Sequence, residues 1–400
     1  MALHGHRSAS AASAGLAGTN LTRAGDYNQR VVLQAIRARG EITRGELADI
    51  TGLTHASVIN ISRRLIADGI VSDLGKTTGT KGQPAMRLAV NPDGAYALGL
   101  NIDREHMTLV VMDLAGRVRE RIYTDKHFAL PGEVVDFLKV SIETILKKRL
   151  VPKTRLIGLG LAIPEQLSGV QVSERPDAYD QWSSLNVVSA FSEQLKLPVF
   201  AENDATSAAI GELQFGGGMT HKSFVYTLIS AGIGCGLIIN GQPYAGGLAH
   251  AGEVGNIPIT PRDGKARILW NAVSLYALYD KLHESGISVS NPEQLDPANP
   301  PMVEAIKAWV DEAVQAMFEP FLGISYLLSP QMHFIGGQLP GFIVEMLCDQ
   351  LNSRLDALAS KFPLARFRRA TTAVDAAAMG AAVMVFQNRL LPRPEVLMKV

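Results

Sequence analysis

The sequence has few cysteines and no long apolar run, and each shortage excludes a class of protein. Two cysteines, Cys235 and Cys348, are too few for a disulfide framework or a cysteine-rich zinc site, and they suit a reducing cytoplasm. No apolar run approaches the ~20 residues that span a bilayer, so we expect a cytoplasmic protein with no membrane partner. The Ala-, Ser- and Gly-rich start lacks a continuous apolar core. It therefore predicts a disordered tail over residues 1–22 and no secretory signal.

The chain also lacks net charge, with 38 Lys and Arg against 38 Asp and Glu. That balance hides an asymmetry, because residues 1–90 contain 11 basic and 6 acidic side chains and the remainder has the opposite surplus. A basic amino-terminal segment on an acidic body is typical of a nucleic-acid-binding module joined to another domain. A length of 400 residues also predicts at least two domains.

The pattern over residues 23–90 predicts one compact unit of three helices and a hairpin. Apolar residues recur at helical spacing in Tyr27–Arg39, and Thr43 with Glu46 forms a capping-box pattern before a short helix. Thr54 precedes a third helix, which is followed by two extended runs around a Gly- and Lys-rich loop. Helix, helix, turn, helix and hairpin is the order of a winged helix-turn-helix.

In such a unit the third helix enters the major groove of DNA, and the hairpin loop, residues 76–84, is the wing. Ser and Asn side chains bind base edges, and Arg reaches guanine or phosphate. The residues that we expect on DNA are Ser57, Asn60, Arg63 and Arg64 on the helix and Lys81 and Gln83 in the wing. The alternative is a small helical bundle with an ordinary solvated face. The tight spacing, the polar outward face and the basic hairpin favour DNA binding.

A turn cluster, Asn91–Gly94, marks a domain boundary. From there to the end the pattern alternates between strands and helices, for example an extended run at 156–163 and a helix at 187–195. Residues 95–400 therefore predict an α/β domain, and it is too long for a single sheet without subdivision.

Three stretches of this domain carry a resemblance to a known family. Residues 224–258 read FVYTLISAGIGCGLIINGQPYAGGLAHAGEVGNIP, residues 201–209 read AENDATSAA, and residues 334–337 read FIGG. They resemble, in turn, the second phosphate loop with its sugar motif, the Glu-Asn-Asp-Ala-Asn block and the adenosine-side loop of the ROK family (repressor, open reading frame, kinase). Residues 18–40 are also similar to the lead-in of the family's repressor branch.

The resemblance implies an actin-like, sugar-kinase-like domain of two lobes with the sugar in the cleft between them, preceded by the winged helix-turn-helix. It places Asp204 on the family's catalytic base, which takes the proton of a sugar hydroxyl. It places Asn203 and Glu253 on residues that bind sugar hydroxyls, and Asn256 on a sugar-contacting histidine. Judged from the residues alone, Asp204 is also a good N-cap for a helix over 205–215, and the two roles are compatible.

The phosphate-binding parts of the family pattern are altered here. The first turn of the kinases reads roughly Asp-Ile-Gly-Gly-Thr, whereas residues 101–105 read Asn-Ile-Asp-Arg-Glu. Glycine lets the backbone approach a phosphate closely, and the carboxylates of Asp103 and Glu105 repel it. The second loop, Ser230–Gly234, lacks the family's Thr hydroxyl, and Glu165 replaces an upstream glycine. We therefore expect no ATP binding and a vestigial Asp204.

The zinc motif of the family is also absent, since residues 256–271 contain no Cys or His. We therefore predict no structural zinc, no other metal and no cofactor.

Retained sugar positions, altered phosphate loops and an attached DNA-binding unit favour a sensor over an enzyme. We predict a sugar-responsive regulator of carbohydrate uptake or metabolism genes, a repressor in preference to an activator, with a sugar or sugar phosphate as effector. The family resemblance implies a homo-oligomer, a dimer or tetramer, on a double-stranded operator. One alternative is a bifunctional kinase that still uses Asp204. Another is a dimerisation platform that responds to a protein partner. The retained sugar-binding positions Asn203, Asp204 and Glu253 weigh against this alternative.

Overall fold

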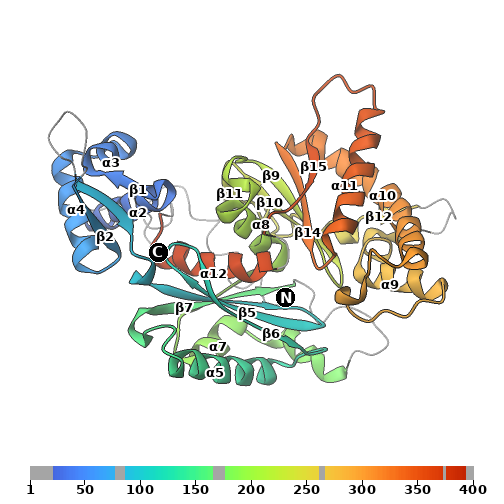
Figure 1. Cartoon of the computed structure of the whole chain (residues 1–400), viewed down its shortest axis with the longest axis horizontal. Coiled ribbons are helices and arrows are strands. Elements are labelled where there is room, and N and C mark those ends of the chain that lie inside the picture. The colour runs from blue at the N-terminus through green and yellow to red at the C-terminus, as the bar shows by residue number, and fades with distance from the viewer. Residues whose placement is uncertain (1–20, 77–85, 165–175, 261–265, 373–374, 393–400) are drawn as a thin grey trace.

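The computed structural model describes residues 21–76, 86–164, 176–260, 266–372 and 375–392. It shows a small amino-terminal unit beside a larger body that contains two five-stranded sheets (Figure 1). The predicted subdivision of the α/β region is therefore confirmed. The tail expected over residues 1–22 lies outside the described residues except for its last two positions, which begin a helix.

The amino-terminal unit has the predicted order, with one strand more than expected. Its elements are α2 (Leu21–Arg39), β1 (Glu41–Thr43), α3 (Arg44–Thr51), α4 (His55–Ala67), β2 (Val71–Lys76) and β3 (Met86–Val90). The predicted capping box is present, because Thr43 Oγ1 accepts from the Glu46 amide at 3.2 Å and Glu46 Oε2 accepts from the Thr43 amide at 2.8 Å. Strand β1 pairs antiparallel with β3 and completes a three-stranded sheet that the sequence pattern missed.

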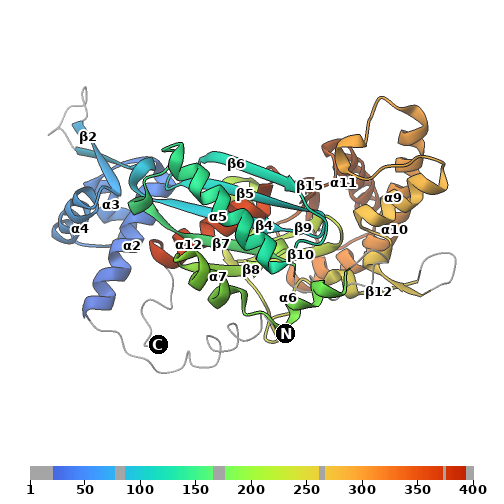
Figure 2. The same cartoon turned by 90° about the horizontal axis from the view of Figure 1, so that it is seen from below.

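The first lobe is a mixed sheet in the order β6-β5-β4-β7-β8. Its elements are β4 (Tyr96–Ile102), β5 (His106–Asp113), β6 (Val118–Asp125), α5 (Pro131–Lys147), β7 (Leu156–Ile163), α6 (Gln181–Ser184), α7 (Val187–Leu195) and β8 (Val199–Asn203). Helices α5 and α7 cover one face of this sheet (Figures 1 and 2). They bury an apolar core that includes Val134, Leu138 and Phe191.

The second lobe contains the sheet β11-β10-β9-β14-β15. Its strands are β9 (Phe224–Ile229), β10 (Ile233–Ile239), β11 (Gln242–Pro243), β14 (Met332–Gly337) and β15 (Arg366–Arg369), with the separate pair β12 (Pro258–Ile259) and β13 (Arg267–Ile268). Its helices are α9 (Leu275–Glu284), α10 (Pro300–Leu328) and α11 (Gly341–Asp356). Trp309 and Phe321 of α10 are fully buried in the core of this lobe.

Two helices lie between the sheets and hold the lobes together. Helix α8 (Asp204–Phe215) packs on β9 and β10, and α12 (Ala376–Arg389) packs on β4 and β7. The two helices also pack on each other at very short range. A Cβ at Gly380 would lie 1.7 Å from the carbonyl oxygen of Ser207, so only glycine permits this crossing.

The amino-terminal unit shares a hydrophobic core with the body. Val32, Ile36 and Leu88 of the unit belong to the same buried cluster as Val383 and Phe386 of α12. The two parts are therefore packed against each other and not merely tethered.

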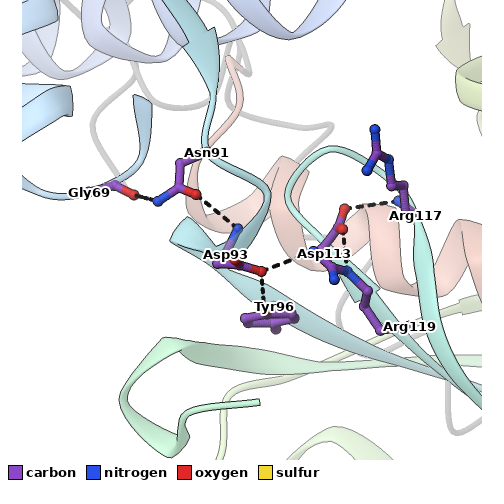
Figure 3. Close-up of polar contacts among 7 residues, drawn as sticks. All are labelled: Gly69, Asn91, Asp93, Tyr96, Asp113, Arg117 and Arg119. Carbon is purple, nitrogen blue, oxygen red and sulfur yellow. Dashed lines mark hydrogen bonds and ion pairs between the residues drawn. The ribbon is translucent and has the colours of Figure 1, made fainter. Parts of the chain in front are cut away.

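Polar contacts reinforce this junction (Figure 3). Asn91 Nδ2 donates to the carbonyl of Gly69 at 2.7 Å, and Asp93 accepts from Tyr96 and Arg119. Arg119 also pairs at 2.6 Å with Asp113, whose side chain is fully buried.

Candidate ligand site and nucleic-acid interface

The start of helix α8 places two of the predicted sugar residues side by side. Asn203 is the N-cap, since its Oδ1 accepts from the Thr206 amide at 3.1 Å. Asp204 is the first helical residue, and its Oδ1 accepts from the Ala205 amide at 2.8 Å. The interpretation of Asp204 as the cap was therefore wrong by one residue, because the strand β8 continues through Asn203. The amide group of Asn203 keeps its NH2 as a donor for a ligand.

The turn between β4 and β5 lies at the same edge of the sheet as the start of α8, because β4, β7 and β8 run parallel. The turn contains three buried residues, Asp103, Arg104 and His106. It is closed by a hydrogen bond from the Asp103 amide to the His106 carbonyl oxygen at 3.0 Å. The Arg104 amide donates to Asp103 Oδ1 at 2.6 Å. Residues 101–106 contain no positive φ, so this turn forms without the glycines of the kinase pattern.

Electrostatics link this turn to Asp204. Burial and the nearby charge of Asp103 raise the pKa of Asp204 to about 7, and Glu253 adds to the effect while Arg104 opposes it. Burial and Asp103 also raise the pKa of Glu105, whose carboxyl is hydrogen-bonded to Tyr276 of α9. Asp103 therefore acts on both Asp204 and Glu105, and Glu253 acts on Asp204.

Glu253 reaches the site from a loop that is fixed to β10. The Cys235 amide donates to the Gly252 carbonyl at 2.8 Å. Gly252 has a φ of 100°, and a Cβ there would clash with the Cys235 carbonyl oxygen, so this position requires glycine. Asn256, at the end of the 3₁₀ turn Val254–Asn256, is exposed, and its Nδ2 lies 3.5 Å from Glu253 Oε2. The structure thus brings Asn203, Asp204 and Glu253 together and places Asn256 at their edge.

Two aromatic residues at this site were missed by the sequence analysis. Tyr276 binds Glu105 across the two lobes, and Trp270 covers the second glycine loop so closely that a Cβ at Gly232 would lie 2.5 Å from its Nε1. A second cross-lobe contact joins His106 Nε2 to Gln338 Nε2 at 3.2 Å. No local pattern signals these residues, because each meets its partner only through the tertiary fold.

Helix α4 presents part of the predicted DNA-binding face. Asn60, Arg63 and Arg64 are exposed, whereas Ser57 is half-buried and its hydroxyl lies 2.9 Å from the Thr54 hydroxyl. Arg64 Nη1 donates to Gln29 of α2 at 3.3 Å. Asn60 and Arg63 are therefore the most accessible of the predicted contacts. The predicted wing residues Lys81 and Gln83, and also Glu165 of the altered upstream loop, lie outside the described residues.

One further residue of this unit was missed. Arg44, the first residue of α3, donates through Nε to the Ser62 hydroxyl of α4 at 2.9 Å. This contact fixes α4 to the helix before it. The Arg at 44 gives no local sign of this role.

The described part of the chain lacks two further features. No group of three or more His, Cys, Asp and Glu side chains there is arranged to hold a metal ion. No helix within the same residues is both long and apolar enough to cross a bilayer.

Comparison with protein families supports the architecture. The model of the ROK family matches residues 97–388. A winged helix-turn-helix DNA-binding model matches residues 26–72. The two matches correspond to the two-lobed body and to the amino-terminal unit.

Individual relatives give the same picture. The xylose repressor of Bacillus spizizenii is 29% identical over 58% of this chain and 60% of its own length. The crystal structure of a ROK family transcriptional regulator, a homologue of the E. coli MLC protein, is 20% identical, covers 91% of this chain and 96% of its own, and has a TM-score of 0.66. A ROK glucokinase from Streptomyces griseus is 20% identical over 73% of this chain and 100% of its own, with a TM-score of 0.58. At these identities the two structures establish the fold only.

Proposed function

Because the chain belongs to the ROK family, and because it carries a winged helix-turn-helix, we propose that it is a sugar-responsive, DNA-binding repressor. It acts in the cytoplasm as a homo-oligomer, a dimer or tetramer, on the operators of carbohydrate uptake or metabolism genes. Its effector binds at Asn203, Asp204, Glu253 and Asn256. The xylose repressors among its relatives support this assignment.

The observation that carries the proposal is the course of helix α8. The helix starts at Asp204 in the ligand site and ends at Phe215, where it meets the first helix of the DNA-binding unit. There Arg37 of α2 donates to Gln214 Oε1 at 2.7 Å, and its guanidinium lies 5.5 Å from the centre of the Phe215 ring. Burial lowers the pKa of Arg37 to about 10, so the cation persists at neutral pH. One rigid element thus joins the two functions.

Helix α12 provides a second connection. Arg30 of α2 donates to the carbonyls of Asn388 and Leu391 at the end of α12, at 3.3 and 3.1 Å. Because α12 packs tightly on α8, a movement of α8 on ligand binding is transmitted to α2 at two points. Reorientation of α2 moves α4, and the two recognition helices of an oligomer then fit their half-sites less well.

DNA binding is tested with duplexes selected from a random library by the full-length protein, followed by fluorescence anisotropy. We expect Asn60→Ala to weaken binding by roughly fivefold or more, because one base contact contributes about 1–3 kcal/mol. The control is Thr22→Ala, at an exposed position of α2. Selection of no sequence, or equal affinity of the Asn60 variant and the control, would contradict the proposed interface.

The second candidate function is a sugar kinase, and the raised pKa of Asp204, about 7, favours it, because a general base works best near the ambient pH. The acidic turn at Asp103 and the Trp270 ring over Gly232 oppose it, since both lie where the family resemblance expects phosphate contacts. We expect sugar-dependent ATP hydrolysis no faster in the wild type than in Asp204→Asn. A turnover that this substitution abolishes would establish the kinase.

A further inference from the structure

We propose that the effector is an uncharged, unphosphorylated sugar, and that Asp103 and Glu105 are the residues that reject its phosphorylated form. This inference rests on the proposed function and concerns the same site. It decides between the free sugar and the sugar phosphate that the sequence left open.

The charges at the site are the first argument. The carboxyl of Asp103 acts on both Asp204 and Glu105, and the carboxyl of Glu253 acts on Asp204. The cation that acts on both Glu105 and Asp204 is the guanidinium of Arg104. A phosphomonoester brings close to two further negative charges, and like charges at this range repel strongly in a partly buried site.

The carboxylates are also held in place. Glu105 is hydrogen-bonded to Tyr276, and its carbonyl accepts from the Lys126 amide at 2.9 Å. Asp103 accepts from the Arg104 amide, whose own carbonyl accepts from the Phe128 amide at 2.7 Å. Neither carboxylate turns away from an incoming anion without breaking a contact.

Three backbone amides at this site already have acceptors. A helix start is an anion site when its amides are free, but at α8 the amides of Ala205 and Thr206 donate to Asp204 and Asn203. The amide of Asp103 donates within its own turn. The hydroxyls of a neutral sugar, in contrast, can donate to these carboxylates directly.

The test is a set of matched titrations on the full-length protein, by calorimetry and thermal shift. The probes are glucose, N-acetylglucosamine and ribose, each paired with its phosphate monoester, together with xylose and inorganic phosphate alone. We expect at least one free sugar to bind at least tenfold more tightly than its phosphorylated form. Inorganic phosphate is expected to give no stabilisation.

Two isosteric variants test the residues named. Asp103→Asn and Glu105→Gln keep the shape of the turn, and we expect each to reduce the preference for the free sugar at least threefold. The control is Asp136→Asn on the exposed face of α5, which should leave the ratio unchanged. Because both variants remove only a charge, a folded protein is expected in each case, and circular dichroism verifies it.

The outcomes separate this inference from the proposed function. A phosphorylated sugar that binds as tightly as its parent, or an unchanged ratio in both variants, overturns the inference and leaves a sugar-responsive regulator intact. If no sugar of either kind binds or alters DNA affinity, the proposed function fails, and the inference fails with it.

Discussion

At the level of single residues, the titration of Asp204 reports directly on the proposed ligand site. Its pKa is raised from the ordinary value of 3.8 to about 7 in the folded protein. The folded state therefore holds this proton more tightly than the unfolded chain, and the resulting stability is present at low pH and is lost as the pH rises towards about 7.

We expect the wild type to lose stability relative to Asp204→Asn between about pH 4 and pH 7. One unit of pKa shift corresponds to about 1.4 kcal/mol, so the whole shift corresponds to about 4 kcal/mol. Because Asp204 is only half-buried, solvent screening reduces this value, and we expect a loss on the order of 2 kcal/mol. Urea denaturation at several pH values measures it. A difference between the two proteins that does not vary with pH would mean that Asp204 is not perturbed.

Single residues also show which parts of the candidate ligand site the sequence can predict and which it cannot. Asn203, Asp204 and Glu253 are predicted from their motifs, because each motif is a local string of letters. Tyr276 and Gln338 are not found this way, since they meet Glu105 and His106 only when the two lobes come together. The exact N-cap was also missed, because Asn and Asp are equally good caps and stand next to each other here.

At the level of elements, the crossing of α8 and α12 depends on Gly380. A Cβ there would lie 1.7 Å from the Ser207 carbonyl oxygen. A backbone atom cannot rotate out of the way as a side chain can, so the two helices would have to move apart. We expect Gly380→Ala to destabilise the protein by about 2 kcal/mol or more. The measurement is the midpoint of thermal or urea unfolding.

The matched control is Gly323, also within a helix, where an added Cβ meets nothing within 4 Å. Gly323→Ala should stabilise the protein by roughly 0.5–1 kcal/mol, because alanine is the better helix former. Equal effects of the two substitutions would contradict the close packing of α8 on α12.

Most elements follow from local patterns, and the exceptions have physical reasons. The strand β7 and the helix α7 have the predicted bounds, since apolar periodicity and flanking turns define both ends. Strand β1 is only three residues long and alternates too briefly to be recognised. Strand β6 is exposed on one side and rich in charged residues, so it lacks the apolar signal of its neighbours.

At the level of the whole molecule, the proposed function requires the DNA-binding unit to be fixed to the body. Arg155, which precedes β7, spans this junction, because its Nη1 donates to the carbonyls of Asp68 at 2.7 Å and Gly94 at 3.1 Å. We expect Arg155→Ala to increase proteolytic cleavage near residues 91–95 several-fold with little change in the overall melting temperature. Lys153→Ala, at an exposed position of the same turn, is the control and should cleave at the wild-type rate.

The most direct test of the account is the effect of the sugar on DNA affinity when the contact between α8 and α2 is broken. Arg37→Ala and Gln214→Ala remove the same hydrogen bond from opposite sides, and Arg39→Ala removes an exposed charge from the same helix as a control. Operator affinity is measured by anisotropy with and without the free sugar that stabilises the wild type. We expect a sugar-induced change of about tenfold in the wild type and in the control. In the two variants we expect a much smaller change, with DNA and sugar each still bound. A full response in both variants would contradict the account.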